Sequence, residues 1–311
     1  MVPAETLVTE LNKATIIPIY PIEAELQASG QSFVLLPEES VTFGSISNWL
    51  SPSNFELWKE YVSEKQRKQL SAADFALIHT FKSSGHVGKE EQVSQDLLNK
   101  VATCLRIIRP TRSRSPFIQL RLLDSGAADV FSFTQPIDQP MNAPQSVVLN
   151  TVRTSDLREL QRTIGKFLRL AAGDTYEFNR AVRYFMAGYM QIDDPVIQIM
   201  VWTAGIEALL STCEFPGDSL SKLFQLIDPN WNIYEDAGFQ QFVPVQVRLD
   251  SVAENLFLLR NRFAHGGWVP PEWANKEARP PIGRSVEYAD MIREAAAAIL
   301  RKLLLIKIDS D

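Results

Sequence analysis

The segment at residues 260–265, Arg-Asn-Arg-Phe-Ala-His, combines residue types that can bind or cleave a phosphodiester. The chain has only three histidines, and chance would place Arg-Asn at this spacing before one of them in about one such chain in 150. Arg260 can hold a phosphate through paired hydrogen bonds and could stabilise a charged phosphorane. His265 could transfer protons near neutral pH, and Asn261 could orient either group. The structural alternative is that Arg260 and Asn261 cap a helix end and His265 packs against a loop.

The segment ends a predicted helix at residues 247–264. A helical wheel groups Val252, Leu256, Leu259 and Phe263 on one stripe, which we expect to face the core. Asn261 and His265 share the opposite face. His265 precedes two glycines, so it should lie at the helix C-terminus, where partial negative charge favours the protonated imidazole.

Two apolar residues of the same helix, Phe257 and Leu258, fall off the expected core stripe. A helix buried on one side only has little reason to place both there. They predict a partner surface, most simply a second copy of the chain.

Glu207 is the one charged residue of the apolar segment at residues 195–210. An isolated buried carboxylate is costly unless it is paired, and Arg260 is a plausible partner. The pair could be a structural lock between two helices, or Glu207 could position Arg260 for phosphate. Both interpretations predict contact between the two residues.

The segments that position these residues form a predicted helical bundle from residue 151 to 311. Apolar residues at intervals of three and four predict its helices, at residues 155–170, 176–190, 195–211, 219–227, 247–264 and 285–308.

The first 150 residues predict an α+β domain, read as a recognition or sensor domain of unknown ligand. Short β-branched or alternating runs predict its strands, at residues 14–20, 32–36, 117–123, 130–134 and 146–150. Helical spacing occurs at residues 55–64 and 91–108. The proline-rich stretch at residues 140–144 is the expected boundary.

Composition is that of an ordinary globular protein, with a net charge of −6 that argues against a whole-protein grip on a polyanion. Cys104 and Cys213 lie far apart and form no CxxC pair, so we expect neither disulfide nor metal site, and no cofactor. Without a signal peptide or a membrane-spanning run, the expected location is the cytoplasm.

The segment at residues 258–267, Leu-Leu-Arg-Asn-Arg-Phe-Ala-His-Gly-Gly, resembles the signature of HEPN domains, a family of nucleotide-binding helical bundles. The segment at residues 202–210, Trp-Thr-Ala-Gly-Ile-Glu-Ala-Leu-Leu, is similar to the preceding core helix of the Apea-like HEPN branch. The resemblance covers roughly residues 153–311.

This resemblance implies a dimeric, metal-independent endoribonuclease, with Arg260 and His265 of both subunits lining one cleft and Asn261 as their polar support. Many such proteins belong to toxin–antitoxin or antiviral systems, which implies RNA as substrate and a possible antitoxin or other protein partner. Other HEPN proteins are non-catalytic modules that bind nucleotide, RNA or protein, and the motif leaves that alternative open.

Further arginines could contact RNA. Candidates are Arg262 and the basic run Arg106, Arg109, Arg112 and Arg114. A solvated charge run is the alternative interpretation of the latter.

Overall fold

The structure is a computed structural model that describes residues 11–19, 22–46, 75–83, 88–109, 117–122, 128–134, 151–190, 195–211, 218–233, 248–264, 277–278 and 286–311. The chain divides into two compact units. The first comprises Met1–Asp138 with Asn150–Gly165, and the second comprises Gln139–Leu149 with Lys166–Asp311. The division therefore falls within one helix, α5 (Thr154–Ala172).

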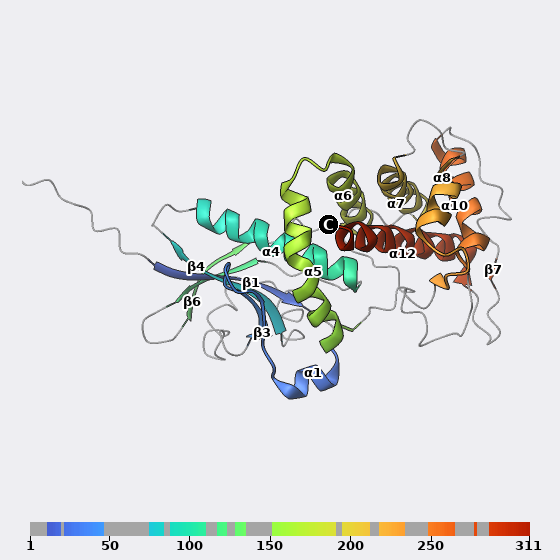
Figure 1. The fold of residues 1–311 in the computed structure, drawn as a ribbon. Coiled ribbons are helices and arrows are strands. Elements are labelled where there is room, and N and C mark those ends of the chain that lie inside the picture. Colours follow the sequence, from blue (N-terminus) through green and yellow to red (C-terminus); the bar gives the residue numbers. More distant parts are fainter. Residues whose placement is uncertain are drawn as a thin grey trace, which may run out of the picture. The chain divides into compact units, whose positions relative to one another are not determined.

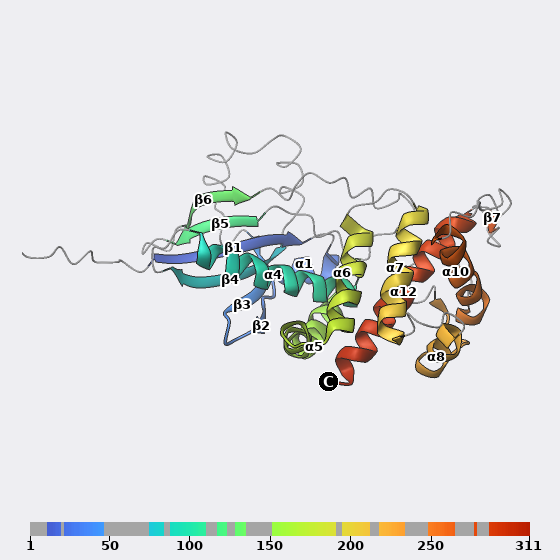
Figure 2. The ribbon, with the colours of Figure 1, turned by 90° about the horizontal axis from the view of Figure 1, so that it is seen from above.

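The first unit contains a six-stranded antiparallel sheet in the order β2-β3-β4-β1-β5-β6 (Figure 2). Its strands are β1 (Leu11–Ile19), β2 (Phe33–Leu36), β3 (Val41–Ser45), β4 (Phe75–Ser83), β5 (Phe117–Leu122) and β6 (Ala128–Thr134). Central β1 contains Pro18, which has no N–H to donate. Pairing with β5 involves only Lys13–Ile16, so this proline lies beyond that ladder.

Helix α4 (Lys89–Ile108) packs on β1 and β4 (Figure 1). Leu98, Val101 and Leu105 recur on one helical face and are fully buried. Ile17 and Leu77 are buried too, and they share a sheet face with the residues that contact α4. A short helix, α1 (Ala24–Ser29), follows β1 in the chain.

Polar side chains join the sheet to the first turns of α4. Lys13 forms a buried ion pair with Glu91, whose other oxygen accepts the Gly88 N–H at 2.9 Å. Ser94 Oγ donates to Thr15 Oγ1 at 2.6 Å and lies 2.7 Å from His79 Nδ1. Because a serine has one hydroxyl hydrogen, Ser94 can donate to only one of these two partners at a time. These bonds fix the register of α4 on the sheet.

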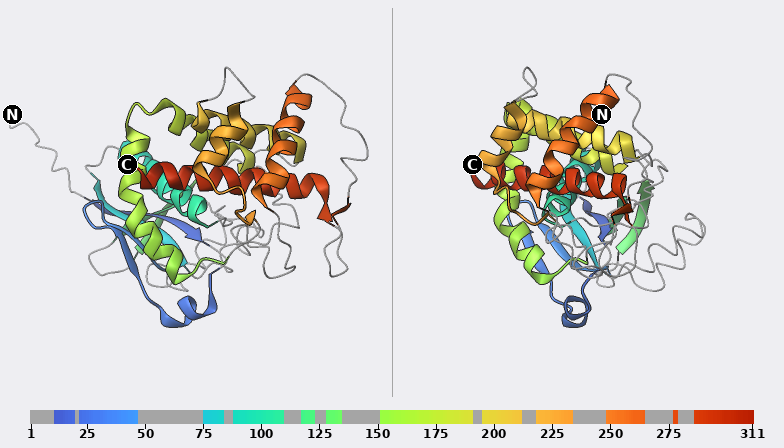
Figure 3. Two further views of the ribbon diagram at one scale, coloured as in Figure 1. Left: turned by 45° about the vertical axis from the view of Figure 1, so that its right-hand side comes forward. Right: turned by 90° about the vertical axis from the view of Figure 1, so that its right-hand side faces the viewer.

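The second unit is helical and includes the end of α5 (Figures 2 and 3). Its further elements are α6 (Tyr176–Met190), α7 (Pro195–Leu210), α8 (Asp218–Leu226), α10 (Leu249–Ala264), β7 (Glu277–Ala278), β8 (Val286–Glu287) and α12 (Tyr288–Asp309). Helix α7 packs against α6, α8, α10 and α12, which makes it the central helix of the unit.

Two glycines allow the close approach of these helices. A Cβ on Gly188 of α6 would overlap the Trp202 indole of α7, and one on Gly205 would meet the Leu300 side chain of α12. Trp202 is buried and its Nε1–H donates to the Phe185 carbonyl at 3.1 Å. Close contact between the helices and the hydrogen-bonded indole of Trp202 thus forms the centre of the bundle.

The expected α+β part followed by a helical part is confirmed, and the helices after residue 153 are present with ends shifted by a few residues. Strand β6 begins at Ala128, two residues before the expected start at residue 130. Strands β3 and β4 and helix α1 were not anticipated. The expected helix at residues 55–64, the strand at 146–150 and the boundary at 140–144 lie outside the described residues.

Within the described ranges, none of the helices combines the length and the apolarity that crossing a bilayer requires.

Candidate functional site

The candidate site lies between α7 and α10, which pack against each other in the second unit. Helix α7 is apolar on all sides, as expected of a helix surrounded by protein. Its buried polar side chains are Gln198, Thr203 and Glu207. Gln198 Nε2 donates to the Gly188 carbonyl, although Gln198 Oε1 is buried without a hydrogen-bond partner among the described residues. Thr203 Oγ1 donates to the Ile199 carbonyl of its own helix. Glu207 instead faces α10.

Arg260 of α10 bridges Glu207 and Asn261. Its Nη2 donates to Glu207 Oε2 at 2.7 Å, and its Nη1 donates to Asn261 Oδ1 at 2.9 Å. The Glu207 side chain is 6% exposed, whereas that of Arg260 is 29% exposed. The guanidinium is thus anchored at a buried carboxylate and reaches the surface, where its remaining N–H groups can donate to an anion.

Burial raises the pKa of the Glu207 carboxyl, because a carboxylate loses its hydration there, and the Arg260 guanidinium opposes this shift. Arg260 is the cation that keeps an ionised Glu207 tolerable in the interior. In return, Glu207 holds Arg260 in one place.

The structure describes some of the other residues of the motif and not others. Arg262 is half-buried on α10. His265 lies outside the described residues, as does the side chain of Phe263. The predicted core positions Val252, Leu256 and Leu259 are buried.

Phe257 and Leu258, the expected partner surface, differ in exposure. Phe257 is 7% exposed and so is buried within its own chain, whereas Leu258 is 38% exposed. The wheel placed both off the core because it considers one helix alone, and several neighbours pack around α10 and α7. Of the two, Leu258 is accessible to a partner.

The basic run does not present a continuous surface in the described residues. Arg106 is buried at 3% exposed, and Arg109 Nε pairs with Asp156 Oδ2 at 3.1 Å. Arg112 and Arg114 lie outside the described residues. Arg109 is therefore engaged in an ion pair within the first unit, and burial makes Arg106 inaccessible to RNA.

Sequence reasoning missed the buried polar contacts of the first unit. It assigned no role to Lys13 or Glu91, which form a buried ion pair between β1 and α4. The sequence does contain a sign of the contact at the start of α4, since Glu91 lies three residues after Gly88, at the spacing of a capping box.

No family model, curated protein or solved structure matches this chain. Within the described ranges, no three His, Cys, Asp or Glu side chains gather as metal ligands would.

Proposed function

We propose that the chain is a metal-independent endoribonuclease of HEPN type that acts as a dimer. The observation that carries the proposal is the anchored but accessible guanidinium of Arg260, five residues before His265. The RNA 2′-hydroxyl attacks the adjacent phosphate, the bond from phosphorus to the 5′-oxygen of the next nucleotide breaks, and a 2′,3′-cyclic phosphate forms. His265 transfers the protons that leave the 2′-hydroxyl and reach the 5′-oxygen, and Arg260 stabilises the phosphorane. Glu207 and Asn261 position Arg260.

The pairing of Arg260 suits this role. A guanidinium that is already oriented loses little conformational entropy when it binds a phosphate. More of its interaction energy is therefore available to stabilise the transition state. Asn261 supports this by accepting from Nη1 through its side-chain oxygen, which leaves its amide NH₂ available to the substrate.

A dimer supplies the arginine and histidine of two subunits to one cleft, and Leu258 offers an exposed apolar contact for it. We place this activity in the cytoplasm, in a toxin, antiviral or stress-response setting, with RNA as substrate and an antitoxin as possible protein partner.

The alternative function is a non-catalytic HEPN module that binds nucleotide, RNA or a protein. One observation favours it: the ion pair of Glu207 with Arg260 joins α7 to α10, and a structural lock would need this pair without any chemistry.

The test is cleavage of single-stranded RNA in the presence of a chelator. Wild type is expected to cleave, and His265→Ala to lose about a hundredfold to ten-thousandfold of the rate, as expected for a general acid or base. Arg260→Lys should lose activity although it keeps the charge, because it loses the planar fork. Arg183→Lys on α6 is the matched control, since Arg183 is exposed.

Cleavage retained by folded His265→Ala protein would contradict the proposal. RNA binding by wild type without any cleavage would favour the non-catalytic module. The setting is tested by expression in cells, where wild type should arrest growth and His265→Ala should not. Light scattering tests the dimer, which Leu258→Glu should weaken.

A further inference from the structure

The first two turns of α4, residues 89–96, bury polar side chains alone. Their buried residues are Glu91 and Ser94, and the first buried apolar residue of the helix is Leu98. Val93, the only apolar residue in these turns, is 59% exposed. An amphipathic helix has the reverse arrangement. Such a departure from the usual pattern is typical of segments with a function.

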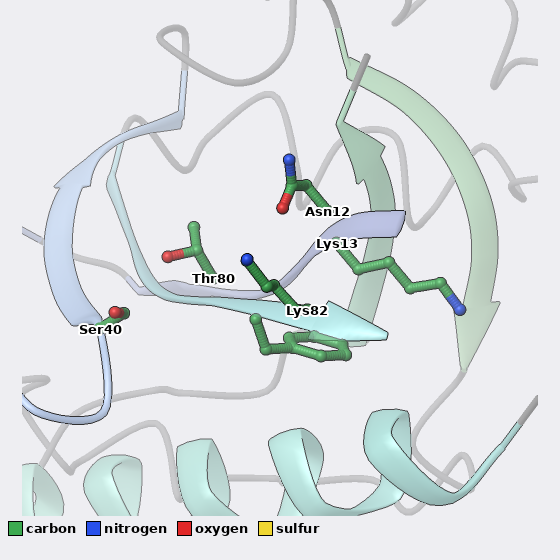
Figure 4. A pocket seen from close by; sticks show the side chains of 6 residues that line it. Asn12, Lys13, Ser40, Thr80 and Lys82 are labelled. Atoms are coloured by element: carbon green, nitrogen blue, oxygen red, sulfur yellow. The ribbon is translucent and has the colours of Figure 1, made fainter. Parts of the chain in front are cut away.

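These turns meet the face of the sheet that carries His79. Thr15 lies directly opposite His79 in the β1–β4 ladder, and Lys13 precedes Thr15 by two residues, so all three share one face. Figure 4 shows the Lys13 side chain leaving the sheet on the other side from the side chains of Asn12 and Thr80.

Two sets of contacts join this face to the first turns of α4. Glu91 pairs with Lys13, and Ser94 Oγ lies 2.6 Å from Thr15 Oγ1 and 2.7 Å from His79 Nδ1. Of these groups, only the imidazole has an ordinary pKa near neutral pH. His79 is 7% exposed, so its charge state matters to the packing of α4.

The surroundings of His79 favour its neutral form. Nearby charged residues come from three elements: Lys13 from β1, Lys89, Glu90 and Glu91 from the first turn of α4, and Glu38 and Glu39 from the turn before β3. The pair of Lys13 with Glu91 has no net charge. Burial lowers the pKa of the His79 imidazole, and the negative charge of Glu39 opposes this only in part.

Protonation of His79 makes both of its ring nitrogens donors. Nδ1 can donate to Ser94 Oγ, whereas Nε2 forms no hydrogen bond with the described residues. A buried positive charge with an unsatisfied N–H is costly, and the cost is relieved when water reaches the ring. Ser94 contacts this ring, so movement of the first turns of α4 would admit water.

Opening these turns costs little elsewhere. Lys13 and Glu91 become hydrated together, so neither is left buried without its counter-ion, which is far less costly than deleting one partner. The second half of α4 keeps its buried apolar residues Leu98, Val101 and Leu105 on the sheet.

We propose that the first two turns of α4 form a pH-controlled latch that is released from the sheet when His79 is protonated, while the second half of the helix stays in place. Because its folded-state pKa is lowered, His79 contributes its stabilisation above the ordinary value of 6.5, and this contribution is lost as pH falls from there toward the folded value. The latch belongs to the first unit and does not depend on the ribonuclease activity proposed for the second.

The test is hydrogen–deuterium exchange of the full-length chain at about pH 7.5 and about pH 5.5, corrected for the intrinsic pH dependence of exchange. Opening of residues 91–97 should increase by about three- to tenfold at the lower pH, and opening of residues 99–107 should not change. Tenfold is the limit, because a released imidazole with its ordinary pKa of 6.5 gains about that much proton binding one pH unit lower.

Three variants locate the response. His79→Gln cannot titrate but can still bond Ser94, so its first turns should exchange equally at both pH values. His86→Gln removes a different histidine and should respond as wild type does. Glu39→Gln should move the response to lower pH, because it removes a carboxylate that favours the imidazolium.

Proton NMR follows the ring of His79, identified by the signal that His79→Gln lacks, and its titration midpoint should lie below 6.5. The exchange measurement on wild type needs no variant, and circular dichroism establishes that each variant is folded. Equal acceleration of both halves of α4, or of neither, would overturn the proposal. So would an acid response that persists in folded His79→Gln protein, or a midpoint at or above the ordinary value.

Discussion

Each unit of this protein buries a glutamate beside a cation, and the two glutamates are affected in opposite ways. In the first unit Glu91 pairs with Lys13, and both side chains are under a tenth exposed. In the second unit Glu207 is equally buried, but Arg260 reaches the surface. Burial acts to raise the pKa of both carboxyls.

The number of donors decides the net result. Glu91 accepts from Lys13 and from the Gly88 N–H at the start of α4, and these bonds overcome the effect of burial and lower its pKa. For Glu207, burial outweighs the charge of Arg260 and its hydrogen bond, and the pKa of this carboxyl is raised. The first pair is arranged to stay ionised and closed, whereas the second holds a cation that can still contact a ligand.

The largest expected effect comes from removing the cation of the closed pair. Lys13→Met leaves Glu91 buried without its ion partner and should lower the free energy of unfolding by roughly 4 kcal/mol in urea titrations. Adding Glu91→Gln should recover most of this, because a neutral amide tolerates burial and can still accept the Gly88 N–H. Lys100→Met, on an exposed position of α4, is the control. If Lys13→Met lowers the free energy of unfolding no more than Lys100→Met does, the proposed role of the buried ion pair is contradicted.

Arg260→Met should cost less, about 2 kcal/mol, because the partly exposed position lets water reach Glu207. The same urea titration measures it, with Arg183→Met on α6 as the exposed control. Combining Arg260→Met with Glu207→Gln should restore stability but not RNA cleavage. Restored cleavage in that double variant would remove the proposed role of Arg260.

The pH dependence of stability separates the pairs by sign. The folded-state pKa of Glu91 is lowered, so its contribution is present above the ordinary value of 4.5 and is lost as pH falls through the folded value. The folded-state pKa of Glu207 is raised, so its contribution is greatest below 4.5 and is lost as pH rises through the folded value. With increasing pH, the stability difference between wild type and Glu91→Gln should grow, and that between wild type and Glu207→Gln should shrink. If thermal melts at increasing pH show the two stability differences changing in the same direction, the contrast is refuted.

The smallest expected effect concerns a strained backbone conformation that occurs at a serine in each unit. Ser211, like Ser40 in the first unit, has φ 52, and it follows the last residue of α7. Ser211→Gly should raise the free energy of unfolding by about 1 kcal/mol, because glycine adopts this conformation without strain. Ser221→Gly, inside α8, should instead lower it by about 0.5 kcal/mol. Calorimetric melting of the two variants compares the signs.

Much of the helical unit was predictable because its helices carry local signals. Tyr176–Met190 was anticipated to the residue, since its apolar spacing and flanking turn residues all lie within the segment. The contact between Glu207 and Arg260 also followed from local reasoning, because a lone charge on an apolar helix requires a partner.

What could not be predicted depends on neighbours distant in the chain. Strand β4 begins with the short apolar run Phe75–Ile78, which periodicity alone does not identify as a strand, and its pairing with β1 and β3 determines its structure. Phe257 is buried by surrounding helices that a single wheel does not include. Likewise, Lys13 and Glu91 are 78 positions apart, and only the register of α4 on the sheet joins them.

The central position of α7 has a consequence for the order in which the molecule opens. Its backbone amides lie within an apolar helix that packs against four others, and Gly188 and Gly205 allow close contact of α7 with α6 and α12. In hydrogen–deuterium exchange, amides near Trp202 and Ile206 should therefore be among the last of the second unit to exchange, through global unfolding only. Arg260 lies on α10, which has a partly exposed edge. The candidate site therefore combines slowly exchanging backbone amides of α7 with faster-exchanging amides of α10.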